Sequence, residues 1–136
     1  MHVQGHCHCG AIRYEAEVDP EKVTICHCTD CQSLTGSAYR VTVAAPAEDF
    51  RLLQGEPRVY VKTTADSGNP RGQAFCPNCG SPLYTFAAGQ SRPASYGLRV
   101  GCLEQRAELL PRKQIWCDSA LGWTRDLGGL PGRPRD

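Results

Sequence analysis

Nine cysteines in a chain of 136 residues constrain this protein more than any other feature of its sequence. Seven of them lie in three short groups with the spacings CxC, CxCxxC and CxxC: Cys7 and Cys9; Cys26, Cys28 and Cys31; Cys76 and Cys79. The first residues of the chain do not resemble a secretory signal. In such a chain, an odd number of clustered cysteines is typical of metal binding in a reducing compartment. We therefore expect metal ligands rather than disulfides, and a cytoplasmic location.

The apolar content shows why such a chain needs more than a hydrophobic core. Val, Ile, Leu and Phe make up only 25 of the 136 residues, slightly below the level at which a chain with high net charge would be disordered. The net charge is only +1, so the high net charge that accompanies disorder is missing. Metal coordination is one means of supplying the stability that a thin core lacks.

Charge and hydropathy disfavour two classes of partner. With 15 basic and 14 acidic residues, the chain lacks the strongly basic character that is typical of nucleic-acid-binding proteins. No stretch approaches the roughly 20 consecutive apolar residues of a membrane span. We expect neither nucleic acid nor membrane as a partner, and the sequence predicts no particular oligomeric state.

Alternating apolar and polar residues predict β-strands through most of the chain. The expected strands lie at residues 12–18, 40–43, 58–62, 84–86, 95–103 and 114–117, separated by turn-rich stretches. The best helical candidate, residues 47–50, is no more than one turn. The sequence thus predicts an all-β, mainly antiparallel fold in a single domain spanning residues 1–136, with 128–136 as a loosely held tail.

The cysteine spacings suggest how thiols could converge on a metal. Side chains at positions i and i+2 of a strand share a face, so each CxC pair could direct two thiolates at one point. The histidine between them would then face away. Cys76 and Cys79 have the spacing of a tight turn, and Gly80 can adopt the positive φ that such turns often need.

Seven clustered thiols divide into a set of four and a set of three. Four thiolates have the composition of a closed structural zinc site, and three leave one position open, as in catalytic zinc sites. Spacing alone does not decide which groups unite. One CxC pair with the CxxC pair is a possible tetrahedron, which would leave Cys26, Cys28 and Cys31 as the set of three.

Three motifs in order resemble a known family: GHCHCGAIRYEAEV, CHCTDCQSLTGSAY and AFCPNCGSPLY. They are similar to the glutathione-dependent formaldehyde-activating enzymes, a family that includes the centromere protein V domain. The similarity continues through GLRVGCLEQ and LPRKQIWCDSALGW and so covers roughly Val3 to Leu130. The resemblance implies the zinc-bearing β-tent fold of that family.

The resemblance also implies ligand sets and a reaction. It implies one structural zinc on Cys7, Cys9, Cys76 and Cys79, and a second zinc, the reaction site, on Cys26, Cys28 and Cys31. The implied activity is that of a carbon–sulfur lyase that interconverts formaldehyde and glutathione with S-hydroxymethylglutathione. A small-molecule thiol such as glutathione is then the expected partner. The alternative is a non-catalytic zinc protein that carries a thiol or serves as an interaction module.

One departure from the family pattern concerns the arginine that members often carry shortly before the FC of the CxxC motif at Cys76 and Cys79. Here the preceding run is Arg71-Gly72-Gln73-Ala74, so Arg71 would have to reach the site from a slightly different position. No Asp/His pair stands out as a general base, and Asp30 is one candidate for that role. The hydroxyls and amides of residues 35–37, shortly after Cys31, could contact a ligand.

The remaining notable residues receive plainer interpretations. Cys102 and Cys117 are expected to be buried thiols that pack as small apolar groups. The four histidines are expected at the surface or in packing rather than as ligands: His2, His6, His8 and His27. Four aromatic residues are expected in the core rather than in the walls of a pocket: Trp116, Trp123, Tyr39 and Tyr84. Three cations are expected on a solvated face, although carboxylates of a glutathione-like ligand would need such groups: Arg40, Lys62 and Arg99.

Overall fold

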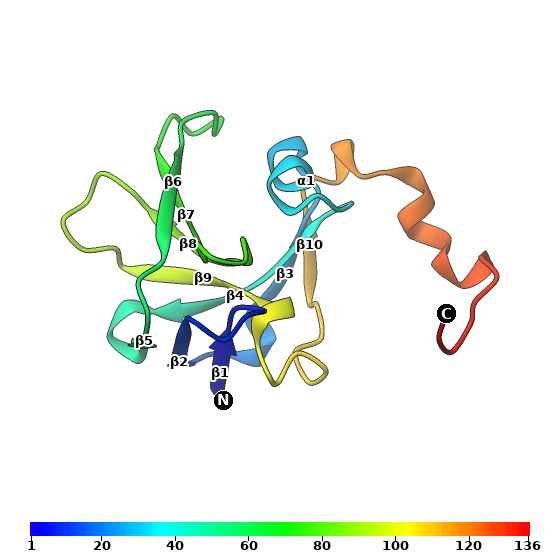
Figure 1. Ribbon diagram of the computed structural model, residues 1–136. Helices are drawn as coiled ribbons and strands as arrows, with labels where there is room; N and C mark the ends of the chain where they lie inside the picture. Colours follow the sequence, from blue (N-terminus) through cyan, green and yellow to red (C-terminus); the bar gives the residue numbers. More distant parts are fainter.

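The computed structural model describes residues 1–136 and consists mostly of β-strands with one short α-helix (Figure 1). The strands are β1 (His2–His6), β2 (Arg13–Glu17), β3 (Val23–Cys26), β4 (Arg40–Pro46), β5 (Phe50–Gln54), β6 (Arg58–Lys62), β7 (Arg71–Phe75), β8 (Pro82–Ala87), β9 (Ser95–Arg99) and β10 (Lys113–Ile115). The helix is α1 (Thr29–Thr35), and five 3₁₀ segments complete the chain: η1 (Pro20–Lys22), η2 (Ala47–Asp49), η3 (Val100–Cys102), η4 (Cys117–Ser119) and η5 (Gly122–Gly129).

The strands form two sheets. A three-stranded sheet has the order β1-β2-β5, and a seven-stranded sheet has the order β10-β3-β4-β9-β8-β7-β6. All pairings are antiparallel except that of β10 with β3. The expected mainly antiparallel, all-β fold is therefore confirmed, and each of the six expected strand regions contains a strand.

A single apolar cluster joins the two sheets. It combines residues of the small sheet, such as Val3 and Tyr14, with residues of the large sheet, such as Val43 and Leu98, all less than 2% exposed. Tyr14 packs edge-on against Tyr84 with ring centroids 5.7 Å apart. The alternation expected for residues 12–18 thus places its apolar side in this core.

Gly5 lies where the backbone of β1 passes closest to this aromatic packing. A Cβ at this position would lie 2.2 Å from the Tyr14 ring, so Gly5→Ala must displace a buried side chain. We expect a loss of about 1–3 kcal/mol in the free energy of unfolding, the usual cost of overpacking a core. Denaturant unfolding measures it. Gly101→Ala is the matched control because nothing lies within 4 Å of its added Cβ, and an equal loss there would contradict the packing explanation.

The face of the large sheet opposite this core is polar. Paired residues share a face, so the strand register identifies its members: Cys26 with Arg40, Thr42 with Arg99, and Thr85 with Gln73. Three of these polar side chains are nonetheless buried: Gln73, Thr85 and Arg99. The expectation that Arg99 belongs to a solvated face is therefore wrong, since its residue is only 6% exposed.

Two local features differ from the sequence predictions. The helix α1 was not expected, because Thr29–Thr35 contains few strong helix formers. It is fixed instead by its ends: the Cys28 sulfur accepts a hydrogen bond from the Cys31 amide, and Gly36 ends it with φ 62°. Strand β6 lies where it was predicted, but its alternation does not give one buried side: β6 is at a sheet edge, and Val59 and Val61 are exposed.

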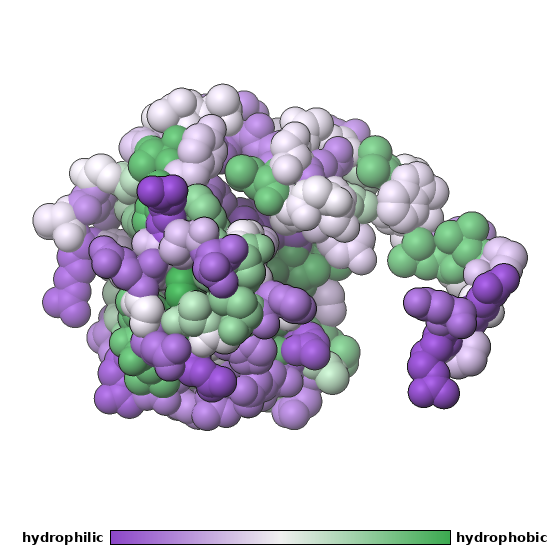
Figure 2. Space-filling view, in the orientation of Figure 1, coloured by the Kyte–Doolittle hydropathy of each residue, from purple (hydrophilic) through white to green (hydrophobic).

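The C-terminal segment extends away from both sheets (Figure 1). It exposes large apolar side chains: Leu121, Trp123, Leu127 and Leu130. In Figure 2, green hydrophobic residues lie on this segment beside purple hydrophilic ones. Trp123 is thus not a core aromatic. The helices of this structure are all too short or too polar to cross a membrane.

Candidate metal centres and an adjoining cavity

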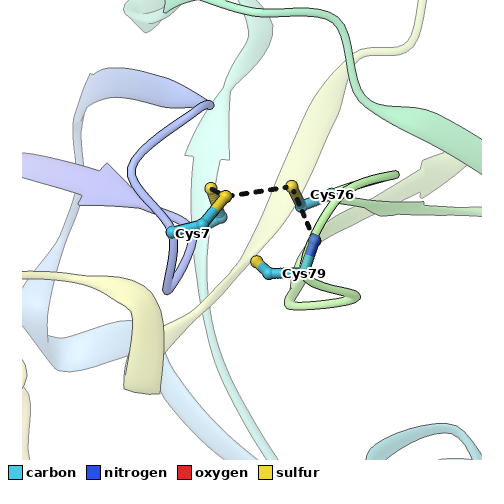
Figure 3. A group of neighbouring side chains, drawn as sticks. Cys7, Cys76 and Cys79 are labelled. Carbon is cyan, nitrogen blue, oxygen red and sulfur yellow. Dashed lines mark hydrogen bonds between the residues drawn. The ribbon is translucent and has the colours of Figure 1, made fainter.

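Four cysteines from two distant parts of the chain form the first thiol cluster. Cys7 and Cys9 lie on the turn after β1, and Cys76 and Cys79 lie on the turn between β7 and β8. Their four sulfur atoms all lie within 4.8 Å of one another. Figure 3 shows Cys7 facing the Cys76–Cys79 turn across a narrow gap.

The sulfur spacing in this cluster fits a tetrahedral metal. Zn–S bonds of about 2.3 Å place tetrahedral sulfur atoms about 3.8 Å apart. The Sγ–Sγ distances are 3.6 Å for Cys7 and Cys9 and 3.8 Å for Cys9 and Cys76. Backbone amides also donate to the sulfurs, from Ile12 to Cys7 at 3.2 Å and from Cys79 to Cys76 at 3.4 Å. Such bonds stabilise thiolates, the form that binds metal.

Two members of this cluster are exposed and favour the thiolate. Hydrogen bonds from Ser81, through its side chain and then its backbone, lower the pKa of Cys79 to about 5. A hydrogen bond from Asn78 is the main cause that lowers the pKa of Cys9. Cys79 therefore favours the ligand form near neutral pH, and Cys9 ionises more readily than an ordinary cysteine.

The geometry of the first CxC pair differs from the expected strand. Cys7 and Cys9 do not share a strand face, because β1 ends at His6 and the chain turns, with the Gly10 amide donating to the Cys7 carbonyl at 3.1 Å. Gly10 has φ 80°, a conformation that suits glycine. The two thiols converge because of this turn, and His8 lies on it, exposed.

The second cluster consists of Cys26, Cys28 and Cys31, whose sulfur atoms also lie within 4.8 Å of one another. Cys26 is the last residue of β3, Cys28 precedes α1 and Cys31 lies in its first turn. The helix, rather than an extended strand, therefore directs the last two thiols toward the first. The Sγ atoms of Cys28 and Cys31 are 2.9 Å apart, so they must separate somewhat if a metal binds with tetrahedral geometry.

The three thiols differ in their surroundings. Cys26 and Cys31 are buried, and burial is the main cause that raises the pKa of Cys31. Burial also opposes ionisation of Cys28, but hydrogen bonds with the Cys31 thiol and amide outweigh it, so the pKa of Cys28 is lowered. Cys28 is the half-exposed thiol of the cluster.

Hydrogen bonds to His27 fix the backbone around this second cluster. Its carbonyl accepts from the Gln32 amide group and from the Ser119 hydroxyl, each at 3.0 Å. Its ring Nε2 is 2.7 Å from Oε1 of Gln114, the central residue of β10. Because the ring is buried and held by Gln114, His27 positions the cluster's surroundings and does not join its thiols, as the sequence predicted.

A cavity of about 540 Å³ adjoins the second cluster. It lies between the start of α1, the loop after β6 and the segment after β10, and its lining includes Cys28, Lys62, Trp116 and Ser119. Trp116 is 51% exposed and has φ 57°, so it is a cavity wall rather than the expected core aromatic. Its left-handed backbone is a strained conformation for a residue other than glycine.

An ion pair and a hydrogen bond lie in the lining of this cavity. Lys62 Nζ lies 3.0 Å from the Asp30 carboxylate, and the Thr64 hydroxyl donates to the same carboxylate at 2.8 Å. Hydrogen bonds from Lys62 and then from Thr64 lower the pKa of Asp30. Lys62 is therefore an ion-pair partner across the cavity rather than a solvated cation, and Asp30 is a poor proton acceptor. Sequence reasoning missed Thr64, since only the tertiary fold brings it to α1.

The remaining candidates lie outside both clusters. Cys102 is half-buried, with its sulfur donating to the Pro82 carbonyl at 3.1 Å, whereas Cys117 is exposed and the expectation of a buried thiol is wrong. The Thr35 hydroxyl donates to the Cys31 carbonyl at 2.7 Å. It thereby caps α1, and residues 35–37 are absent from the cavity lining.

Comparison with known proteins identifies relatives among curated proteins and among solved structures. A Halomonas elongata protein, provisionally named a glutathione-dependent formaldehyde-activating enzyme, is 28% identical over 90 residues, covering 63% of this chain and 57% of its own. A protein of Schizosaccharomyces pombe, named an uncharacterized lyase, is 30% identical over 84 residues, covering 60% of this chain and 55% of its own. The matched region thus spans little more than half the length of either relative.

The fold and the family are both matched. The crystal structure of a Rhodobacter sphaeroides protein superposes with a TM-score of 0.62 at 24% identity, covering 82% of this chain and 99% of that one. This likeness concerns the fold alone. The family model described as glutathione-dependent formaldehyde-activating enzyme matches residues 2–119. With its two thiol clusters and two-sheet fold, the chain belongs to the glutathione-dependent formaldehyde-activating enzyme family.

Proposed function

We propose that this protein is a zinc-dependent carbon–sulfur lyase that acts on a glutathione-like thiol–aldehyde adduct. The observation that carries the proposal is the position of Cys28, a thiol of the three-cysteine cluster that also lines the cavity. Membership of the family and the names of the two relatives support the same assignment. The reaction joins formaldehyde to the thiol of glutathione or releases it again.

Each thiol cluster fits a different zinc role. Cys7, Cys9, Cys76 and Cys79 have the four-sulfur composition of a structural site. Such a zinc would link the turn after β1 to the turn between β7 and β8, in a single domain of residues 1–136 with 128–136 as its tail. Cys26, Cys28 and Cys31 would hold a second zinc with one position open, and this zinc would supply Lewis-acid chemistry to a sulfur or oxygen ligand.

The reaction requires mainly that the protein bind and orient the two reactants. In the forward direction the sulfur of the thiol forms a bond to the carbonyl carbon of formaldehyde, and the thiol proton ends on the carbonyl oxygen. Thiols add readily to this electrophile, so proximity is the main contribution to be expected. Cys28 and Trp116 bound the cavity in which both reactants would meet.

Zinc content is the first test of this proposal. Elemental analysis of protein purified under reducing conditions without chelator should give about two zinc ions per chain, because each of the two thiol clusters has a composition that can hold one metal ion. Protein with this content should convert formaldehyde and glutathione to S-hydroxymethylglutathione faster than the uncatalysed addition. A content of one zinc, or a rate equal to that without protein, would contradict the lyase assignment.

A second candidate function is that of a non-catalytic thiol carrier on the same cluster. The observation that favours it is Asp30, whose carboxylate is engaged by Lys62 and Thr64 and is unsuited to take a proton. The two candidates differ in one measurement. A carrier binds glutathione with no acceleration of its reaction with formaldehyde, whereas a lyase shows both.

A further inference from the structure

Most of the large exposed apolar side chains of the molecule lie in two places. Four lie on the C-terminal arm, residues 121–130, and are 38–62% exposed: Leu121, Trp123, Leu127 and Leu130. Five lie on the β5–β6 surface, formed by these two strands, and are 42–56% exposed: Leu52, Leu53, Val59, Tyr60 and Val61. Single exposed apolar residues are ordinary, whereas groups of them mark surfaces that bind a partner.

The C-terminal arm has no partner in its own chain. Its hydrogen bonds are local, such as the one that the Thr124 amide donates to the Leu121 carbonyl at 3.0 Å. No hydrogen bond or ion pair joins residues 121–136 to the sheets. All of these residues except Thr124 are exposed. The arm also lies beyond residues 2–119, which the family model matches, so it is an addition to the matched domain.

The β5–β6 surface is formed by two edge strands. β5 ends the order of the small sheet, and β6 ends the order of the large sheet. The outer side of an edge strand carries backbone N–H and C=O groups that no neighbouring strand pairs. Apolar side chains on such an uncovered edge favour association with another chain. This surface therefore needs a cover that the two sheets do not supply.

The arm of the same chain does not provide this cover. The arm follows β10, which lies at one edge of the large sheet, while β6 lies at the other edge, six strand spacings or roughly 30 Å away along the sheet. The eight residues of η5 span only about 16 Å as a 3₁₀ helix. Figure 1 shows the arm extending to the right, away from the sheets, and β6 on the left. The arm of a second copy does not have this restriction.

We propose that the C-terminal arm of one copy binds the β5–β6 surface of a second copy, and that the two copies exchange arms reciprocally. A two-fold axis makes the two contacts identical and closes the assembly at a dimer. This inference goes beyond the proposed function and does not depend on it.

The available areas favour this exchange over the packing of two arms against each other. At about 200 Å² for a large side chain, the exposed parts of the four arm side chains amount to roughly 400 Å². The five side chains of the β5–β6 surface expose a similar area. Two arms packed together would bury about 800 Å² in total, which is no more than a crystal contact buries. Reciprocal exchange would bury about 1,600 Å², the usual size of a stable interface.

Sedimentation analysis of the zinc-loaded, reduced protein over a dilution series tests the proposal. The native chain should form a dimer that dissociates on dilution. Trp123→Asp, on the arm, and Tyr60→Asp, on the β5–β6 surface, should each raise the Kd of the dimer at least about 30-fold, as expected for an aromatic side chain at the centre of an interface. Leu110→Asp is the matched control, because Leu110 is 57% exposed and belongs to neither surface. It should leave the Kd unchanged, and circular dichroism checks that each variant is folded.

A mixture of the two variants tests whether the exchange is reciprocal. In a mixed dimer, the intact arm of the Tyr60→Asp chain meets the intact β5–β6 surface of the Trp123→Asp chain, so one of the two contacts remains. The mixture should therefore contain dimer at concentrations at which neither variant alone forms one.

Several results would refute the proposal. A native chain that is monomeric at every concentration would exclude a second copy as the partner. A dimer that Trp123→Asp leaves unchanged would exclude the arm, and one that Tyr60→Asp leaves unchanged would exclude the β5–β6 surface. Assemblies larger than a dimer, or no dimer in the mixture, would contradict reciprocal exchange. None of these results depends on thiol or formaldehyde chemistry, so failure of this proposal is distinguishable from failure of the lyase assignment.

Discussion

Replacing Cys76 with serine should remove most of the stability of the native fold. The four-thiol cluster ties the turn after β1 to the turn between β7 and β8, and structural zinc contributes about 10–16 kcal/mol in small domains. Whole domains of this kind are stable by only about 5–15 kcal/mol. We therefore expect thermal denaturation of Cys76→Ser to show a midpoint lowered by more than about 15 °C, or no cooperative transition at all.

The matched control for this variant is Cys117→Ser. Cys117 is exposed and belongs to neither thiol cluster, so its replacement should leave the midpoint unchanged. Chelation of zinc from the native protein should reproduce the effect of Cys76→Ser. A folded Cys76→Ser protein that keeps its full zinc content would refute the assignment of this cluster as the structural site.

The second large effect is expected at Cys28, and it concerns turnover rather than folding. Cys28→Ser removes the half-exposed thiol of the three-cysteine cluster. Changing a residue that only hydrogen-bonds to a metal ligand already lowers activity or metal affinity by about 10–100-fold. Loss of a ligand should therefore lower the rate of S-hydroxymethylglutathione formation by at least about 100-fold. Single-turnover and steady-state assays with glutathione and formaldehyde measure this.

The fold should survive the same substitution. The Cys28 sulfur accepts the hydrogen bond of the Cys31 amide at the start of α1, and serine is among the best residues at this helix position. The melting temperature of Cys28→Ser should thus stay within a few degrees of the native value. Unchanged turnover in this variant would rule out the lyase mechanism at the second cluster.

Most of the fold class could be read from local patterns. The alternation at Tyr14 and Ala16 placed a strand with one buried side, because a period of two depends only on neighbouring residues. Helix α1 escaped the same reasoning because its propensity is low and its start is capped by a cysteine. Strand β7, with the sequence RGQAF, carries no clear alternation and is defined by its neighbours β6 and β8.

The order of amino acids alone settles which side chains are available for chemistry. It supplied seven clustered thiols, and through the motifs around them it predicted two sets of metal ligands, which stay a prediction until zinc is measured. It also supplied the near-neutral charge and the strand pattern. These properties depend on residue identity and short spacing alone.

Which of these groups meet in space depends on long-range contacts of the fold. Cys9 and Cys76 are 67 positions apart in the chain, yet their sulfur atoms lie 3.8 Å apart. Arg99 looked like a member of a solvated face, because alternation shows that two sides of a strand differ but not which side is covered. Long-range strand pairing buried Arg99 against Gln73 and left its charge unpaired. That outcome depends on contacts between distant segments, which no local pattern contains.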